Sequence, residues 1–133
     1  MEIVPFASVP GAFIIRGGIE NADVLLQKLI DEIPWTTQRW RSRDLPRLVC
    51  RQDHFGERTA ILNTVLRIGQ EAHNVIRQTH FFLKISTQMS VYCNYYRNGA
   101  DYTPYHADSY GADIISVSLG GPRNFAFRLK GTT

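Results

Sequence analysis

His106 and Asp108 are the two residues whose types and spacing most directly suggest chemistry. Side chains at positions i and i+2 of an extended segment point to the same side, so an imidazole and a carboxylate at this spacing can both reach one metal ion. The same pair also arises as a hydrogen-bonded surface histidine beside an exposed aspartate. We therefore treat His106 and Asp108 as candidate metal ligands that supply half of a metal site or slightly more.

A segment of alternating character precedes this pair and must position it. Its two faces are Met89, Val91, Cys93 and Tyr95 on one side and Ser90, Tyr92, Asn94 and Tyr96 on the other. This period of two predicts a strand, which ends in a turn at Asn98-Gly99. The second face is polar and aromatic, as a pocket lining is. Asn94 and Tyr96 on that face are donors suited to a carboxylate or keto acid.

Two further alternating segments follow. Residues 114–119 and 124–130 each place apolar and polar side chains on opposite faces, and Gly120-Gly121-Pro122 between them predicts a tight turn. Together with the strand before His106, they predict three successive strands of one antiparallel sheet or barrel. No repeat or low-complexity segment interrupts the chain, so we expect one domain over residues 1–133.

Two helices are predicted in the N-terminal half, after a short apolar strand at residues 13–15. Leucine and isoleucine recur at helical spacing up to Ile33, following a cap at Asn21 or Asp23, and Pro34 ends the pattern. A second amphipathic helix is expected from about Thr59 to Gln78. Both helices are expected to pack on the sheet.

The segment from Trp35 to Gly56 is expected to be irregular or hairpin-like and to lie at the surface. It carries a cluster of arginines, namely Arg39, Arg41, Arg43, Arg47 and Arg51. Such a cluster is compatible with a phosphate backbone as partner, although a solvated face is the commoner explanation of a charge run. Partial burial of Trp35 and Trp40 against the first helix is favoured over stacking on bases.

The composition is that of an ordinary globular protein. The 133 residues are 44% hydrophobic and 20% charged, with a net charge of +3 and a pI near 9.1, so disorder is not expected. Cys50 and Cys93 do not form a disulfide framework, and neither a secretory signal nor an apolar run of about 20 residues is visible. We expect no membrane association and an intracellular location, in the cytoplasm or nucleus.

Five short motifs, taken together, resemble those of the AlkB branch of the iron(II)- and 2-oxoglutarate-dependent dioxygenases. The motifs are Asn94-x-Tyr96, Asn98-Gly99-x-Asp101, His106-x-Asp108, Ser116-Val117-Ser118-Leu119-Gly120 and Arg123-x-Phe125-x-Phe127-Arg128. The resemblance is dense from Val91 to Arg128 and fainter back to Leu45-Pro46-Arg47. As a joint pattern it is highly specific.

The resemblance implies an α+β fold built on a double-stranded β-helix, or jelly roll, with N-terminal helices buttressing one face. It implies that His106 and Asp108 are two of the three ligands of a facial triad that holds Fe(II). It assigns Asn94 and Tyr96 to hydrogen bonds with 2-oxoglutarate. The implied cofactors are therefore Fe(II) and 2-oxoglutarate, with O2 as cosubstrate.

The activity that the resemblance implies is oxidative dealkylation of alkylated bases in DNA or RNA. Nucleic acid would then be the partner, and the target base would be flipped out of its stack. Arg47 lies where the family's nucleotide-recognition lid begins and Tyr105 directly precedes the histidine ligand, so both are candidate substrate-binding residues. Arg123 is expected to contact a phosphate or to pair with Asp113 or Asp101, and these alternatives rank equally.

The family pattern continues with a distal histidine, the third iron ligand, and an arginine that binds the far carboxylate of 2-oxoglutarate. The printed sequence stops at Thr133 before either of them. We therefore expect the jelly roll to be incomplete at its C-terminus and the 133-residue chain alone to be inactive or nearly so. His73 and His80 are expected to be surface or capping residues, and neither they nor His54 is expected to replace the distal ligand.

Two alternatives to this activity stay open. One is a catalytically inactive nucleic-acid-binding or interaction module built on the partial dioxygenase fold. The other is a dioxygenase that acts on a protein side chain or a lipid. The salt dependence of binding distinguishes a nucleic-acid target from a neutral one, because binding through several phosphates weakens steeply as salt rises.

Overall fold

The computed structural model describes residues 2–6, 8–79, 89–106 and 114–129. Its elements in chain order are β1 (Glu2–Pro5), β2 (Phe13–Arg16), α1 (Ala22–Glu32), β3 (Thr36–Trp40), β4 (Arg43–Arg51), a short 3-10 helix (Gln52–His54), α2 (Thr59–Thr79) and β5 (Tyr92–Tyr95). The described elements form a mixed α+β structure with two antiparallel sheets, β1-β2 and β3-β4-β5, so the predicted α+β class is confirmed. These two small sheets do not establish a jelly roll, which stays a prediction.

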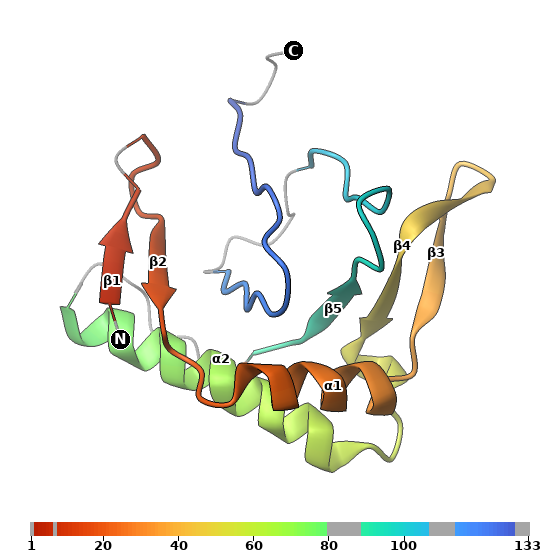
Figure 1. Ribbon diagram of the computed structural model, residues 1–133, viewed down its shortest axis with the longest axis horizontal. Coiled ribbons are helices and arrows are strands. Elements are labelled where there is room, and N and C mark those ends of the chain that lie inside the picture. Colours follow the sequence, from red (N-terminus) through yellow and green to blue (C-terminus); the bar gives the residue numbers. More distant parts are fainter. Residues whose placement is uncertain (1, 7, 80–88, 107–113, 130–133) are drawn as a thin grey trace.

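The helices cross below the sheets, as Figure 1 shows. The β1-β2 hairpin rises near one end of the molecule, β3-β4-β5 near the other, and residues 114–129 run between them. Two of the close approaches that position this last segment involve Phe6 and α1. The rings of Phe127 and Phe6 meet at 5.7 Å between centroids, and a Cβ at Gly120 would lie 3.0 Å from the Leu26 side chain of α1. Gly120, at φ +87°, thus allows both the turn and the close approach to α1.

Both predicted helices are present. Asn21 precedes α1 in the left-handed conformation, at φ 52° and ψ 45°, and its side chain makes no capping hydrogen bond. At the other end Ile33 is extended, its N–H donates to the Leu29 carbonyl at 3.2 Å, and Pro34 follows without an N–H to continue the helix. Of the two predicted caps, Asn21 holds the cap position, without a side-chain bond, and Asp23 lies inside the helix; the predicted end before Pro34 is confirmed. Helix α2 ends one residue beyond its expected boundary, at Thr79.

Strands β3 and β4 form a hairpin with one register shift, between Thr37 and Arg39, and a hairpin is one of the two forms expected after Trp35. Trp40 pairs with Arg43 across a two-residue turn in which Arg41 and Ser42 have φ values of 50° and 68°. Positive φ at both central residues matches the twist of the strands, although Asn-Gly is the usual choice. The expected surface location is wrong for β4, because β3 and β5 pair with its two edges. The buried residues of β4 are Leu45, Arg47, Val49 and Cys50.

The hydrophobic core lies where the end of α1 and the start of α2 meet β4 and β5. Its buried members are Ile33, Cys50, Phe55 and Ile61, and the residues packed against them are Leu29, Trp35, Leu62, Val91 and Cys93. Trp35 donates its indole N–H to the Ile30 carbonyl at 3.3 Å, and its ring lies 5.3 Å from that of Tyr95 between centroids. The predicted partial burial of Trp35 against the first helix is therefore confirmed.

His73 is buried, with 3% of its surface exposed, so the prediction of a surface or capping residue is wrong. Its position explains the error. Residues three apart on a helix share a face, and His73 lies three residues before the buried Ile76 on α2. The imidazole thus occupies the apolar face of this helix.

Cys50 and Cys93 are direct partners across β4 and β5, and both are free thiols. They take part in the same core cluster, on one side of the sheet. Burial, with Cys50 close by, raises the pKa of the Cys93 thiol to about 11. Cys93 is therefore protonated at neutral pH and packs as a small apolar side chain.

No strand forms over residues 114–129 in the described part of the chain, so the two strands predicted there are wrong. The alternating pattern indicates which side chains share a face, but a strand also needs a neighbouring backbone to accept and donate its hydrogen bonds. The apolar side chains of this segment lie largely in solvent. The exposed ones are Ile114, Val117, Phe125, Phe127 and Leu129.

Replacing Phe55 by alanine is expected to destabilise the fold by about 3–5 kcal/mol, because its ring is fully buried where the 3-10 helix joins the core. Urea unfolding followed by circular dichroism measures the change. Val24→Ala on α1 is the control: Val24 is 69% exposed, and its loss should change the free energy of unfolding by no more than about 0.5 kcal/mol. Equal effects of the two substitutions would contradict this core.

Candidate functional site

One face of the β3-β4-β5 sheet carries a connected set of polar side chains. Arg47 of β4 is 5% exposed, and its Nε donates to Oδ1 of Asn94 on β5 at 2.8 Å. Its Nη2 donates to Oε1 of Gln38 at 2.7 Å, and the same oxygen accepts from the Tyr92 hydroxyl at 3.0 Å. Gln38 lies at the register shift between β3 and β4, which lets its side chain reach inward. We call these four residues the Arg47 network.

The Arg47 network brings together two residues that the sequence assigns to different tasks. Asn94 is the candidate cosubstrate residue and Arg47 the candidate substrate residue, and one hydrogen bond joins them. Arg47 was expected in a surface segment, and its burial in the sheet corrects that expectation. The predicted polar and aromatic face of the strand before His106 is present, but Ser90, Tyr92 and Asn94 on it are exposed to solvent, so its prediction as a pocket lining is not confirmed.

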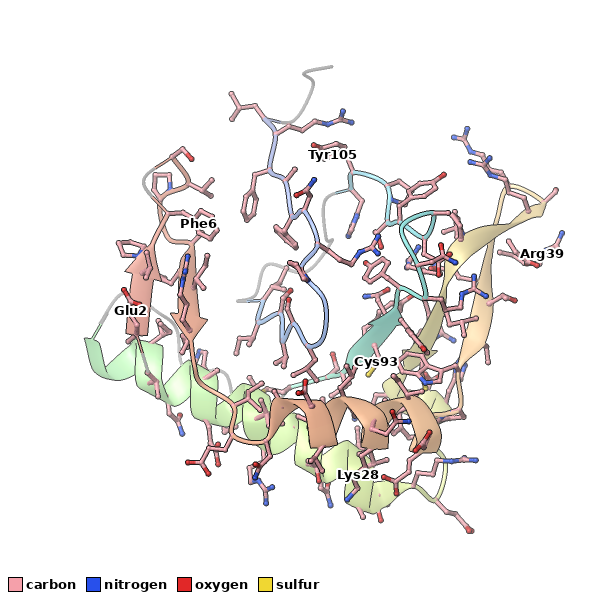
Figure 2. All side chains as sticks on the ribbon, viewed as in Figure 1. Glu2, Phe6, Lys28, Arg39, Cys93 and Tyr105 are labelled. Carbon is pink, nitrogen blue, oxygen red and sulfur yellow. The ribbon has the colours of Figure 1, made fainter. Side chains whose placement is uncertain are left out.

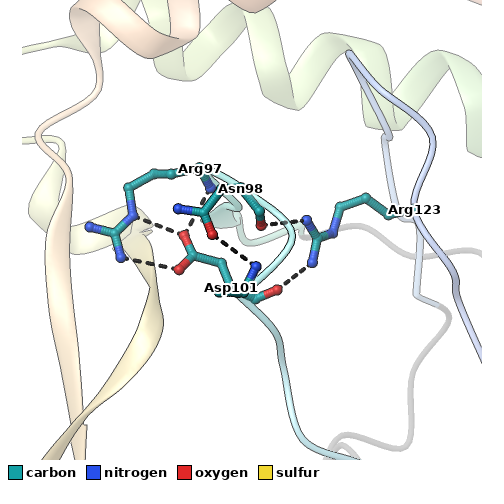
Figure 3. Close-up of polar contacts among 5 residues, drawn as sticks. Arg97, Asn98, Asp101 and Arg123 are labelled. Atoms are coloured by element: carbon teal, nitrogen blue, oxygen red, sulfur yellow. Dashed lines mark hydrogen bonds and ion pairs between the residues drawn. The ribbon is translucent and has the colours of Figure 1, made fainter.

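The turn after β5 is closed by a buried carboxylate, as Figure 3 shows. Asp101 is 3% exposed. Its Oδ2 accepts from both the backbone N–H and the Nε of Arg97 at 2.8 Å, and its Oδ1 accepts from Nη2 of Arg97 at 3.2 Å. Asn98 adds a local bond, because its Oδ1 accepts from the Ala100 N–H at 2.8 Å. The N–H of Tyr102 then donates to the Pro46 carbonyl at 2.9 Å and ties the turn to β4.

These contacts fix the charge states of the turn. Hydrogen bonds from the Arg97 side chain and backbone hold the pKa of the Asp101 carboxyl below its usual range, and the nearby Arg123 acts in the same direction. The same pair raises the pKa of the Arg97 guanidinium. Asp101 is therefore ionised throughout the neutral and mildly acidic range.

Arg123 reaches this turn from the segment that follows it. It donates through Nη1 to the Asn98 carbonyl at 3.0 Å and through Nη2 to the Asp101 carbonyl, and its guanidinium lies 4.4 Å from the centre of the Tyr96 ring. Arg123 therefore contacts Asp101, one of its expected partners, through the backbone oxygen and not through the carboxylate, and Asp113 lies outside the described residues. The carboxylate of Asp101 forms its ion pair with the guanidinium of Arg97.

Tyr96 and His106 stand on either side of this turn. The Tyr96 hydroxyl shares a hydrogen bond of 2.6 Å with Oγ1 of Thr103. Nδ1 of His106 lies 2.9 Å from the Pro104 carbonyl, and because a carbonyl only accepts, Nδ1 carries the proton. The lone pair of the neutral ring is then on Nε2, the tautomer that a metal ligand coordinating through Nε2 needs.

Tyr105, the second candidate substrate-binding residue, is not part of the Arg47 network. It is 54% exposed, and the guanidinium of Arg128 lies 4.1 Å from the centre of its ring. Arg47 and Tyr105 are therefore not brought together as one substrate site among the described contacts. Tyr105 forms a cation–π pair with Arg128 instead.

Asp108, the second candidate metal ligand, lies outside the described residues. Among the residues that are described, no three His, Cys, Asp or Glu side chains converge as a metal site would require. His106 is the described part of the candidate site, and its tautomer fits a metal ligand.

Comparison with protein-family models, with curated proteins and with solved structures found no significant match to this chain. In the described ranges, neither helix is long and apolar enough to cross a membrane.

Two features of the site were missed by sequence reasoning. Gln38 gave no signal, because its inward direction depends on the register shift in β3. The Arg97–Asp101 pair had a visible signal, since its partners lie four residues apart around Asn98-Gly99, a spacing at which a turn brings side chains together. Gln38 helps to fix Asn94, because both bond to Arg47, and the Arg97–Asp101 pair closes the turn that follows Asn94.

Asp101→Asn is expected to destabilise the fold at neutral pH and to have a smaller effect in acid. The folded-state pKa of Asp101 is depressed, so its stabilisation is complete above the ordinary value near 3.8 and is lost as pH falls through the lower folded value. Urea unfolding of both proteins from pH 7 to pH 2.5 measures this. Asp44→Asn is the control, because its 3.7 Å pair with Arg39 is exposed. A difference between wild type and Asp101→Asn that is independent of pH would contradict the assignment.

Proposed function

We propose that this chain carries the iron and 2-oxoglutarate site of an AlkB-like dioxygenase, which removes alkyl groups from bases of DNA or RNA by oxidation. The observation that carries the proposal is the braced segment from Asn94 to His106. Asn94 is bonded to β4, the turn is closed by Arg97 and Asp101, and the His106 ring is held by a backbone carbonyl. The residues that the motifs assign to cosubstrate and metal therefore lie on one internally bonded stretch.

Iron would be held by His106 and Asp108. The hydrogen bond from Nδ1 of His106 to the Pro104 carbonyl supports this role, because metal-binding histidines commonly donate their other ring N–H to a carbonyl or carboxylate. When bound, iron supplies activation of O2, with 2-oxoglutarate as the source of electrons. The chain's own part is to hold the imidazole in the tautomer that binds metal.

Asn94 and Tyr96 would orient 2-oxoglutarate. Because Oδ1 of Asn94 accepts from Arg47, the amide is fixed with its Nδ2 donors directed elsewhere. The Tyr96 ring is held by Thr103 at its hydroxyl and by Arg123 at its face. Fixed donors of this kind suit the carboxylate and keto oxygens of an organic acid.

His106→Ala is expected to weaken Fe(II) binding at least about tenfold, since even the loss of a partner behind a metal ligand costs that much. Isothermal titration of the chain with Fe(II) under anaerobic conditions measures the affinity. Asp108→Ala should have a similar effect. His54→Ala is the matched control, because His54 is exposed at the end of the 3-10 helix and should leave the affinity unchanged. Equal affinity of wild type and His106→Ala would refute the metal site.

Nucleic acid is the partner that the β3-β4 hairpin supports. Its exposed arginines are Arg39, Arg41, Arg43 and Arg51. Asp44 and Asp53 offset two of these charges through exposed ion pairs at 3.7 and 3.6 Å. Figure 2 labels Arg39 on this hairpin, at the outer edge of the molecule. Arginine on a projecting hairpin can reach a phosphate backbone without disturbing the sheet behind it.

The double substitution Arg41→Gln with Arg43→Gln is expected to weaken binding to single-stranded DNA. If each arginine contacts one phosphate, the slope of log affinity against log salt falls by about 1.4, because a contact on a single strand contributes about 0.7. Fluorescence anisotropy from 50 to 300 mM NaCl measures both quantities. Arg67→Gln, exposed on α2, is the control. An unchanged slope in the double variant would remove the hairpin from the interface.

The two sets of measurements also separate the alternatives. Salt-dependent DNA binding without Fe(II) binding would favour the non-catalytic nucleic-acid module, which the exposed hairpin supports by itself. Fe(II) binding without any salt-dependent DNA binding would favour a dioxygenase of a protein side chain or a lipid.

A further inference from the structure

The guanidinium of Arg47 is buried with unused hydrogen-bonding capacity. Its Nη1 is inaccessible to solvent and has no acceptor among the residues that the structure describes. Nε and Nη2 each have one, the amide oxygens of Asn94 and Gln38. A buried N–H group without an acceptor costs free energy, and the cost is larger when the group is charged.

The charge of Arg47 also lacks a counter-charge within the described ranges, because both of its partners are neutral amides. The contrast with other arginines is clear. Arg39, Arg51 and Arg97, whose side chains are 46–66% exposed, each pair with an aspartate. Of these four arginines, the one most shielded from water is thus the one whose described partners include no carboxylate, although burial makes a counter-charge most valuable.

The groups around Arg47 are mainly donors once their internal bonds are counted. The amide oxygens of Asn94 and Gln38 accept from the guanidinium, and that of Gln38 also accepts from the Tyr92 hydroxyl. The donors that remain are Nη1 of Arg47 and the amide nitrogens of Asn94 and Gln38, while the Tyr92 hydroxyl oxygen and one lone pair of Asn94 Oδ1 can still accept. A cluster of donors around one positive charge is the environment that an oxyanion requires.

We propose that the Arg47 network is a binding site for the carboxylate of a small organic acid. One guanidinium carries one positive charge, which a single carboxylate balances, and its planar N–H groups match carboxylate geometry. Gln38 is half-buried and bonds to both the guanidinium and the hydroxyl of Tyr92, which is 45% exposed, so we expect movement of these two side chains to open the site. The site shares Asn94 with the proposed function but requires neither iron, O2 nor nucleic acid.

Thermal unfolding of the whole chain, without metal, tests the site with sodium succinate as the probe. At ten times its dissociation constant, succinate should raise Tm by about 5 °C relative to NaCl of equal ionic strength. Isothermal titration gives the dissociation constant, and inorganic phosphate is titrated in parallel. A Tm response to succinate no larger than that to NaCl would overturn the proposal, and so would phosphate binding tighter than succinate by tenfold or more.

Gln38→Glu is the decisive variant, because it supplies an internal carboxylate 2.7 Å from Nη2 with almost no change of shape. Gln38→Glu should weaken succinate binding at least about tenfold, because its own carboxylate would already pair with the guanidinium that succinate needs. Gln70→Glu on α2 adds the same charge elsewhere and should bind like wild type. Should Gln38→Glu not fold, Asn94→Asp places the carboxylate on Nε with the same expectation. Succinate affinity equal to wild type in the folded variant would overturn the proposal.

The outcome is independent of the proposed function. Succinate binding that Gln38→Glu removes supports the site even if His106 binds no iron. Conversely, iron binding that depends on His106 stands even if succinate does not bind.

Discussion

The pairing of β4 with β5 is the interaction on which the rest of the described structure depends. It joins residues 47 positions apart, Arg47 and Asn94, in one antiparallel sheet. Because side chains alternate across a sheet, this one pairing serves two purposes. One face places Cys50 beside Cys93 in the core against the helices, and the other holds the Arg47 network. A register shift of one residue would exchange these faces and place a guanidinium in the apolar core.

Strand β4 also fixes the direction in which the chain leaves β5. The Pro46 carbonyl accepts from the Tyr102 N–H, so the turn closed by Asp101 is anchored one residue from Arg47. Arg123 then binds two carbonyls of that turn from a distant part of the chain. Two side chains thus hold the turn: the carboxylate of Asp101, which is part of the turn, and the guanidinium of Arg123, which comes from a later segment. The turn between Asn94 and His106 is therefore fixed by bonds to β4 and to Arg123 as well as by its own.

Features set by local periodicity could be predicted, and features set by pairing could not. The apolar spacing before Pro34 and along α2 gives the helices, and the alternation around Asn94 gives β5. Residues 114–129 alternate equally well yet form no strand, because their pattern does not specify a neighbour. Likewise, the burial of Arg47 depends on the amides of Gln38 and Asn94, which lie far from it in sequence. The roles of Asn94, Tyr96 and His106 stay predictions that this geometry supports.

The three arginines of β4 lie in two different environments, exposed and buried. Arg43, Arg47 and Arg51 recur at every fourth residue and so lie on the same face of the strand. The outer two are exposed at its ends, where water solvates the guanidinium and an anionic polymer can reach it. Of the three, only Arg47 is buried, and the side chains that bond to its guanidinium come from both neighbouring strands, Gln38 from β3 and Asn94 from β5. Since neutral amides cannot cancel its charge, the positive field of Arg47 stays uncompensated among the described residues, and the acid that we propose there would be held separately from a phosphate that we propose at the hairpin.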